Sequence, residues 1–111
     1  MNDLSWDEFE RVEIRVGTIL TAEPLPKARV PAYILTIDFG EPVGIRKSSA
    51  RITALYSPEE LIGRQIVGVV NFPPKQIGSI KSQCLVTGFY REDGVVLAVP
   101  DKPVPNGLRL G

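Results

Sequence analysis

The amino-acid sequence predicts an all-β domain, built as a small, partly open barrel of five strands with short helices. Short segments in which apolar and polar residues alternate indicate strands with one buried face. Glycine and proline, ten of each, separate these segments. One helical signal falls between the third and fourth segments. A length of 111 residues suits one domain, spanning residues 1–111, with a single core.

The chain begins with the signals of a short helix. Ser5 and Glu8, three residues apart, form the pattern of a capping box at a helix start. Trp6 and Phe9 share one side of such a helix, because residues three apart are neighbours on its surface. We therefore predict a short N-terminal helix with an apolar side.

Two strands follow this helix. Alternation predicts the first over residues 12–21, where Gly17 suggests a bulge or a sharp bend. The proline-rich stretch at residues 23–26 ends it. The second strand is predicted near residues 32–39. One face of it carries large apolar side chains, namely Tyr33, Leu35, Ile37 and Phe39.

A third strand and a helical turn come next. The strand is predicted near residues 44–53, and its polar centre indicates an exposed face. Ser57 then stands at the N-cap of a helical turn, with Pro58 at the first helical position and Gly63 at its end.

The second half of the chain supplies the remaining strands. We predict them near residues 65–71, 83–90 and 95–99, followed by an extended, proline-rich tail. A helix between the third and fourth of five strands is the plan of the OB-fold. A β-sandwich is the competing architecture, but it usually lacks a helix at that place.

The segment from Val69 to Ser82 is the most informative for function. Pro73 and Pro74 cannot donate backbone hydrogen bonds, so the strand ends there and a stiff segment leaves the sheet. This segment carries an aromatic, an amide and cations but no acid, namely Phe72, Lys75, Gln76 and Lys81. Such a loop suits a large, often anionic ligand. The alternative interpretation is a surface turn with solvated lysines.

Charge is unevenly distributed along a chain whose net charge is zero. Residues 1–26 contain two cations and six acidic side chains, whereas residues 27–81 contain eight cations and four acidic side chains. We expect either a basic face that favours anions or a fold that interleaves the charges in space. No apolar run approaches the length of a membrane helix. The acidic N-terminus and the single cysteine suggest a cytoplasmic protein.

The residue types needed for common catalysis are missing. The chain contains no histidine and one cysteine, Cys84. It therefore lacks the commonest general base, and these residues cannot form a zinc site. Cys84 lies in an apolar run and is interpreted as a buried small hydrophobe. We predict neither an enzyme nor a bound metal or cofactor.

A second candidate binding segment covers residues 45–52. Lys47, Ser49 and Arg51 share one face of the predicted strand, and Ser48 lies on the other. Hydroxyls beside cations suit contacts to phosphate and sugar. Phe72 is open to three interpretations: stacking on an unpaired base, packing against a peptide side chain, or burial in the core.

At these residues the sequence resembles the tRNA-binding-domain superfamily, and within it the CsaA family of export-related chaperones. The resemblance covers residues 9–107, and its most specific segments are F-P-P-K-Q-I-G and S-S-A. Four further segments carry it, namely V-E-I-R-V-G-T-I-L-T-A-E-P, L-T-I-D-F-G, Y-S-P-E-E-L-I-G-R-Q and P-D-K-P-V-P-N-G. The chain departs from the family pattern at Gln83, where an acid often stands, and in the cations Lys47 and Arg51.

The resemblance implies a homodimeric OB-fold chaperone without enzyme activity, which binds unfolded or export-bound polypeptides or preproteins. Structure-specific tRNA binding through the same barrel face is the alternative function. The expected ligand-binding residues are Lys47, Ser48, Ser49, Arg51, Asn71, Phe72, Pro73, Lys75, Gln76, Lys81 and Ser82. The expected dimer interface lies in the terminal additions, at Trp6, Phe9, Val104, Pro105 and Leu108.

Overall fold

A computed structural model describes all residues from Met1 to Gly111. It contains two helices, α1 (Trp6–Glu10) and α2 (Pro58–Leu61). The longer strands are β1 (Ile14–Pro24), β2 (Tyr33–Asp38), β3 (Ile45–Ala50) and β4 (Gln65–Val69). The shorter strands are β5 (Lys75–Ile77), β6 (Ile80–Ser82), β7 (Leu85–Val86), β8 (Gly88–Arg91) and β9 (Gly94–Leu97).

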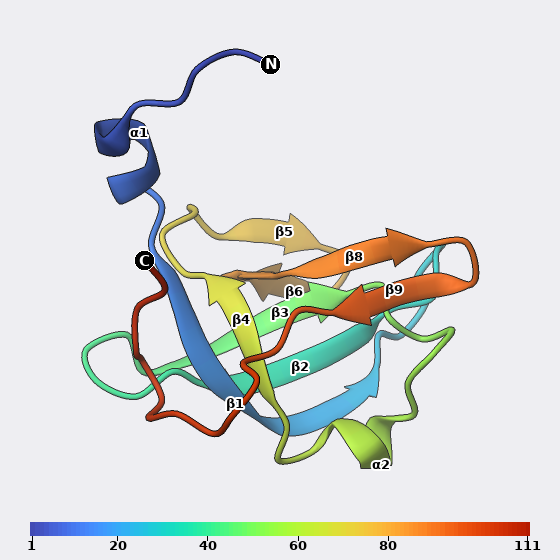
Figure 1. The fold of residues 1–111 in the computed structure, drawn as a ribbon. Helices are drawn as coiled ribbons and strands as arrows, with labels where there is room; N and C mark the ends of the chain where they lie inside the picture. Colours follow the sequence, from blue (N-terminus) through green and yellow to red (C-terminus); the bar gives the residue numbers. More distant parts are fainter.

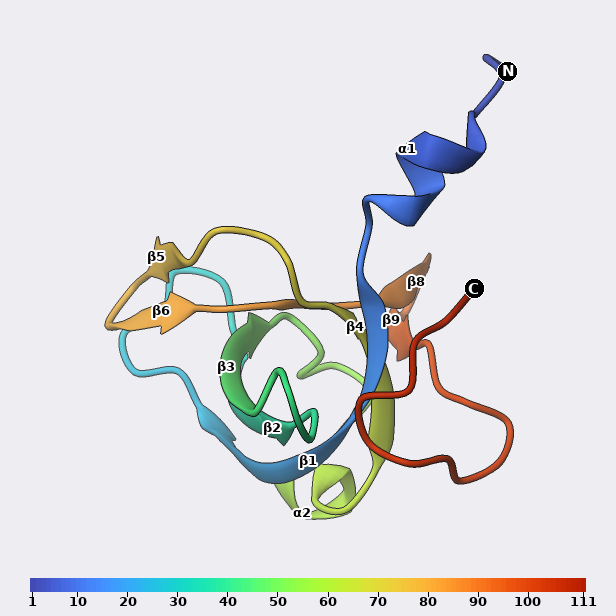
Figure 2. The same cartoon turned by 90° about the vertical axis from the view of Figure 1, so that its left-hand side faces the viewer.

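Five of these strands form an antiparallel sheet in the order β3-β2-β1-β4-β7, which curls into a nearly closed barrel. Figure 2 looks into this ring, where the segment after β6 crosses the side that β3 and β4 leave open. Helix α2 lies between β3 and β4 in the chain and packs beside β1. This is the predicted OB-fold arrangement.

The barrel interior holds the main core. The β2 face that alternation predicts to be buried, from Tyr33 to Phe39, lies in this core. Leu35, Ile37 and Phe39 are fully buried. No helix of the structure has the length and apolar character that crossing a bilayer requires.

Gly17 does not mark the bulge that the sequence suggests. The register of β1 against β2 shifts between Ile19 and Thr21 instead. A Cβ at position 17 would lie 2.6 Å from Ile37 Cγ2 and 2.7 Å from Phe39 Cδ1. Glycine is therefore required there because the core approaches the backbone closely.

The C-terminal tail covers part of β1. β1 pairs with β4 at residues 14–18 and with β2 at residues 18–24. On the β1 edge that β2 leaves free, Val16 N donates to Leu108 O at 3.1 Å and Leu110 N to Ile14 O at 2.8 Å. The tail thus completes the sheet locally and brings the C-terminus beside the start of β1 (Figure 1).

Two features of the second half differ from the sequence-based prediction. The stiff segment after the prolines returns as the β5–β6 hairpin, which packs its Ile77 and Ile80 on a small separate cluster around Leu25. The strand predicted over residues 83–90 divides into β7 and β8, because the chain leaves its partner β4 and pairs with β9.

Candidate ligand-binding groove

Four hydrogen bonds close the barrel between β3 and residues 82–84. Ser48 Oγ donates to Cys84 O at 3.1 Å. The backbone N–H of Gln83 donates to Lys47 O at 2.7 Å, and the Gln83 side chain accepts from Lys47 N at 2.9 Å. Ser82 Oγ accepts from Ser49 N at 3.1 Å. We call this set of contacts the barrel seam.

The seam separates the two faces of β3 as the period of two predicts. Ser48 is only 1% exposed and its hydroxyl is engaged in the seam. Ser49 is half-buried and Lys47 is exposed on the opposite face. Ser48 therefore contributes to closing the barrel, and its outward neighbours contribute to the surface.

Beyond the seam the two edges separate and leave a groove of about 640 Å³. One wall is the end of β3 and the residues after it, from Ser49 to Ile52. A second comes from the diproline segment and the β5–β6 hairpin. The third comes from β7, β8 and β9. The lining residues are Ser49, Ala50, Arg51, Ile52, Phe72, Pro73, Lys75, Ile77, Ser82, Cys84, Leu85, Val86, Gly88, Tyr90 and Val95.

The groove presents large apolar side chains to solvent. Phe72 is 54% exposed, Leu85 is 50% exposed and Tyr90 is 96% exposed. Phe72 is therefore a surface residue, and of the three interpretations of its role, burial in the core is wrong. Several exposed apolar residues around one concavity are typical of a surface that contacts a partner.

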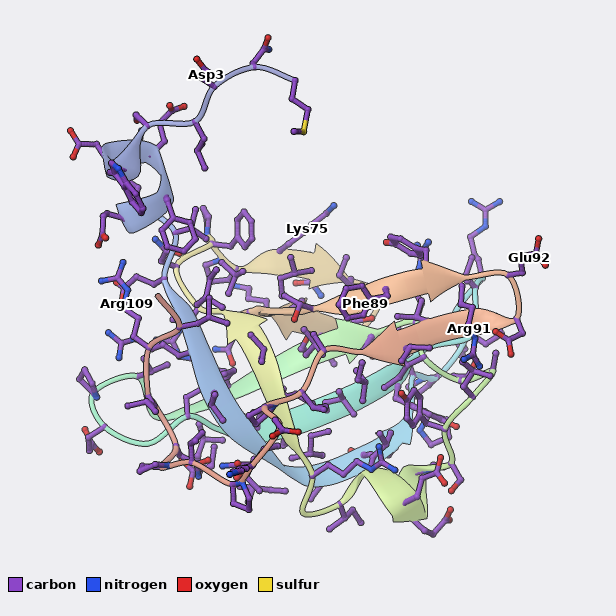
Figure 3. All side chains as sticks on the ribbon, in the orientation of Figure 1. Asp3, Lys75, Phe89, Arg91, Glu92 and Arg109 are labelled. Carbon is purple, nitrogen blue, oxygen red and sulfur yellow. The ribbon has the colours of Figure 1, made fainter.

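The charged residues of the groove are all cationic. Arg51 and Lys75 line it, and no acidic residue does. Lys47 and Lys81 are exposed on the adjoining strands β3 and β6. None of these four cations forms an ion pair, whereas the three ion pairs of the molecule involve Arg15, Arg91 and Arg109. Lys75 extends outward from β5 in Figure 3. The charges of Lys47, Arg51, Lys75 and Lys81 are thus available to an anionic group.

Five predicted ligand-binding residues lie outside the groove lining, namely Lys47, Ser48, Asn71, Gln76 and Lys81. Lys47 and Lys81 are exposed on the adjoining strands, and Ser48 is buried in the seam. Asn71 joins the barrel to the start of β1: its Oδ1 accepts from Glu13 N at 3.0 Å, and its Nδ2 donates to Arg11 O at 2.7 Å. Gln76 Nε2 donates to Gly78 O at 3.0 Å within the β5–β6 turn. The structure therefore engages both amides in hydrogen bonds within the chain.

Cys84 lies at the base of the groove as a free, buried thiol. Burial raises its pKa to about 11. It is therefore protonated near neutral pH and a poor nucleophile. No group of three or more acidic or cysteine side chains lies close enough together to hold a metal ion.

The termini form a separate apolar region. Helix α1 projects from the barrel (Figure 1), and Trp6 is 83% exposed on it. Phe9 and Val104 are half-buried, and Pro105 and Leu108 are exposed. The tail is held in place because Gln65 Nε2 donates to Val104 O at 2.6 Å and Thr18 Oγ1 donates to Asn106 Oδ1 at 2.7 Å.

Sequence reasoning missed the β8 side of the groove. The strand predicted over residues 83–90 contains Leu85, Gly88 and Tyr90, but its sequence pattern predicts no binding role for them. The signal that finds them is the pair Phe89-Tyr90 just before the Glu92-Asp93 turn. Adjacent strand residues face opposite ways, so two neighbouring aromatics on a two-stranded hairpin place at least one of them toward solvent.

Comparison with known proteins places the chain among its relatives. A family model described as "Putative tRNA binding domain" matches residues 14–109. The crystal structure of a CsaA chaperone from Bacillus anthracis is 46% identical, has a TM-score of 0.92 and covers 99% of this chain and 100% of that one. A CsaA chaperone structure from Picrophilus torridus is 42% identical with a TM-score of 0.91, covering 98% and 100% of the two chains.

Enzymes are also among the relatives. A methionine–tRNA ligase from Thermococcus kodakarensis is 34% identical over 110 residues, which is 99% of this chain and 14% of that protein. The chain therefore spans about a seventh of the length of that relative.

Proposed function

We propose that this protein, which belongs to the tRNA-binding-domain family and is CsaA-like, is a non-enzymatic homodimeric chaperone. In this proposal it binds unfolded or export-bound polypeptides in the groove and works in the cytoplasm. The observation that carries the proposal is the groove itself, in which exposed apolar side chains surround an unpaired set of cations.

The chemistry of the groove favours an extended polypeptide. Phe72, Leu85 and Tyr90 form an exposed apolar surface. An unfolded polypeptide exposes the apolar residues that its folded state would bury, and these residues pack favourably against such a surface. Arg51 and Lys75 attract acidic side chains of the bound polypeptide. Each such ion pair at the protein surface stabilises binding by about 0–1 kcal/mol. The likeness to the two CsaA chaperones extends over the whole of both chains, whereas the ligase relative matches over a small part of its length.

The apolar region at the termini supports a second copy of the chain as partner. Helix α1 is five residues long, and none of its residues is buried. Trp6 therefore has little packing against the rest of its own chain. Exposed apolar side chains lie on helix α1, on the residues that flank it and on the C-terminal tail, namely Leu4, Trp6, Val12, Leu108 and Leu110. Pairing of this region between two copies would bury them, and about 25 cal/mol per Å² of apolar surface stabilises such a contact.

A second candidate function is binding of structured tRNA by the same face. The four unpaired cations Lys47, Arg51, Lys75 and Lys81 favour it, and so does the family's printed description. Phe72 and Tyr90 are exposed aromatics on which an unpaired base stacks.

A salt titration of the purified protein distinguishes the two functions. Binding to a denatured preprotein and to total tRNA is measured side by side as salt rises. The chaperone function predicts preprotein binding that changes little with salt. The tRNA function predicts an affinity that falls by about 0.7–0.9 log units per log unit of salt for each phosphate neutralised. Absence of preprotein binding at every salt concentration would rule out the chaperone function.

A charge variant tests the tRNA alternative directly. We expect replacement of Lys47, Arg51 and Lys75 by alanine to abolish tRNA retention in a filter assay at low salt. The matched control replaces Arg11, Arg64 and Lys102, three exposed cations that do not line the groove. Equal tRNA retention by the two variants would rule out recognition by the groove face.

A further inference from the structure

We propose that an unfolded polypeptide binds by adding a β-strand to the free edge of the segment from Val86 to Tyr90, inside the groove. This inference rests on the proposed chaperone function and specifies its binding mode. It follows from the direction in which the backbone groups of this segment point.

One edge of the segment is already occupied. Leu85 pairs with Val69 of β4. Thr87 N donates to Val67 O at 3.0 Å, and Thr87 O accepts from Ala98 N at 3.1 Å. The backbone groups of residues 85 and 87 therefore point toward β4 and β9. Because N–H and C=O groups alternate between the two edges of a strand, those of Val86, Gly88 and Tyr90 point the other way.

The seam shows where β3 lies relative to this segment. Cys84 directly precedes β7, and its carbonyl accepts from Ser48 Oγ on β3. β3 and the segment are therefore joined at Cys84, and beyond that residue they separate into the groove.

The outward edge and the groove coincide. Val86, Gly88 and Tyr90 all line the groove. No side chain forms a hydrogen bond with the backbone of any of the three, in contrast to Lys47 and Ser49 at the seam. All four residues of β8 are exposed. A row of free backbone donors and acceptors thus borders a space of about 640 Å³.

This edge lacks the features that normally protect an exposed strand. Edge strands are usually blocked by proline, by charged side chains or by a covering loop. The sequence from Leu85 to Tyr90 is L-V-T-G-F-Y, with no proline and no charge. Gly88 has no side chain that could cover the backbone. A larger residue would not fit there, because a Cβ would lie 2.7 Å from Val95 Cγ1 and 2.9 Å from Val96 O. The edge is left open to an added strand.

The occupant that fits is an extended peptide with alternating apolar and acidic side chains. Main-chain hydrogen bonds to the edge provide affinity without sequence information, which suits a binder of many unfolded chains. Alternate side chains then face either the apolar floor near Leu85 or the cations Arg51 and Lys75. An RNA strand has no peptide groups with which to continue the ladder.

Substitution of Tyr90 separates the backbone contribution from that of the side chain. Tyr90→Pro removes the N–H that is inferred to point into the groove. The bond from Ala98 N to Thr87 O sets the alternation, by which Phe89 and Arg91, and not Tyr90, are expected to bond to β9, so the proline is expected to leave the β8–β9 hydrogen bonds in place. Tyr90→Ala removes the ring and keeps the N–H. We expect the proline variant to bind a synthetic peptide of alternating valine and glutamate about tenfold more weakly than the alanine variant. Circular dichroism and urea unfolding check that both variants are folded.

The peptide itself provides a second test that does not alter the protein. Two isomers are compared, N-methylated either on every valine or on every glutamate. In an extended strand these amides lie on opposite edges, so one isomer loses its bonds to the protein and the other keeps them. We expect one isomer to bind at least about tenfold more weakly than the other. Equal affinities of the two isomers would overturn the proposal.

The outcomes distinguish this inference from the function on which it rests. If the wild-type protein binds the unmodified peptide while the proline and alanine variants bind it equally, strand addition is wrong and the chaperone function stands. If the wild-type protein retains only tRNA and no peptide, both are wrong.

Discussion

The hydroxyl of Ser48 donates a hydrogen bond of 3.1 Å to the backbone carbonyl of Cys84, across the line where the barrel closes. Both residues are buried. The groove begins beside this contact, since Cys84 also forms part of its lining. One buried hydrogen bond thus fixes the point at which two strand edges stop touching and an open binding space begins.

Loss of this bond is expected to destabilise the barrel. Ser48→Ala removes the shorter of the two hydroxyl hydrogen bonds to the Cys84 carbonyl and leaves only that from Ser82 Oγ at 3.4 Å, which costs about 0.5–1.5 kcal/mol of unfolding free energy. Ser49→Ala is the matched control, because the Ser49 hydroxyl forms no hydrogen bond within the chain and faces outward. Urea unfolding of both variants measures the difference. Equal stabilities would show that the seam does not depend on the Ser48 hydroxyl.

A methyl group at position 17 is expected to overpack the core. Gly17→Ala places a Cβ within 2.6 Å of Ile37 Cγ2 and 2.7 Å of Phe39 Cδ1. Core overpacking typically costs about 1–3 kcal/mol. Gly111→Ala, where a Cβ meets nothing within 4 Å, serves as the control. Thermal unfolding followed by circular dichroism compares them, and an unchanged midpoint for Gly17→Ala would contradict the close approach.

The buried thiol is expected to make stability fall at high pH. The pKa of Cys84 rises from an ordinary value of 9.0 to about 11 because burial disfavours the thiolate. Above about pH 9 the unfolded chain therefore releases this proton while the folded chain retains it, and the free energy of unfolding decreases. Urea unfolding from about pH 8 to about pH 10 measures this decline.

The matched variant for this pH series is Cys84→Ala, which cannot ionise at that position. We expect its stability to decline less steeply than that of the wild-type protein over the same range. Parallel curves would show that the thiol keeps its ordinary pKa. Slow labelling of the native thiol by a disulfide reagent at neutral pH, and fast labelling in urea, give an independent check.

Removal of the N-terminal segment is expected to weaken dimerisation. Deletion of residues 1–10 removes α1 and its exposed Trp6 and leaves the barrel strands and the groove in place. In the proposed homodimer, sedimentation velocity should show a shift toward monomer relative to the full chain at the same concentration. An unaltered dimer would reject the role assigned to Trp6 and Phe9.

The N-terminal helix itself follows from local sequence alone. Ser5 and Glu8 form the predicted capping box, with Glu8 N donating to Ser5 Oγ at 3.1 Å and Ser5 N donating to Glu8 Oε1 at 3.0 Å. These bonds lower the pKa of Glu8. The pattern predicts the helix because every group involved lies within four residues.

The β5–β6 hairpin and the division between β7 and β8 are not predictable in this way. Pro73 and Pro74 show where β4 must end, but the hairpin is held by packing of Ile77 and Ile80 on a cluster around Leu25, about fifty residues away in the sequence. The strand divides after Val86 because its partner changes from β4 to β9. Alternation in one segment carries no information about which strand lies beside it.

Taken alone, the sequence determined the first four strands along the chain, the helix between β3 and β4, the alternation of faces along β3 and the cationic, proline-stiffened loop. Each of these depends on the period of a segment or on the backbone limits of one residue type. Only the tertiary structure decided that Ser48 closes the barrel, that Asn71 joins it to the N-terminal segment, and that an open edge from Val86 to Tyr90 borders the groove. Those features are contacts between residues far apart in the chain, and closure of the barrel is the physical event that brings them together.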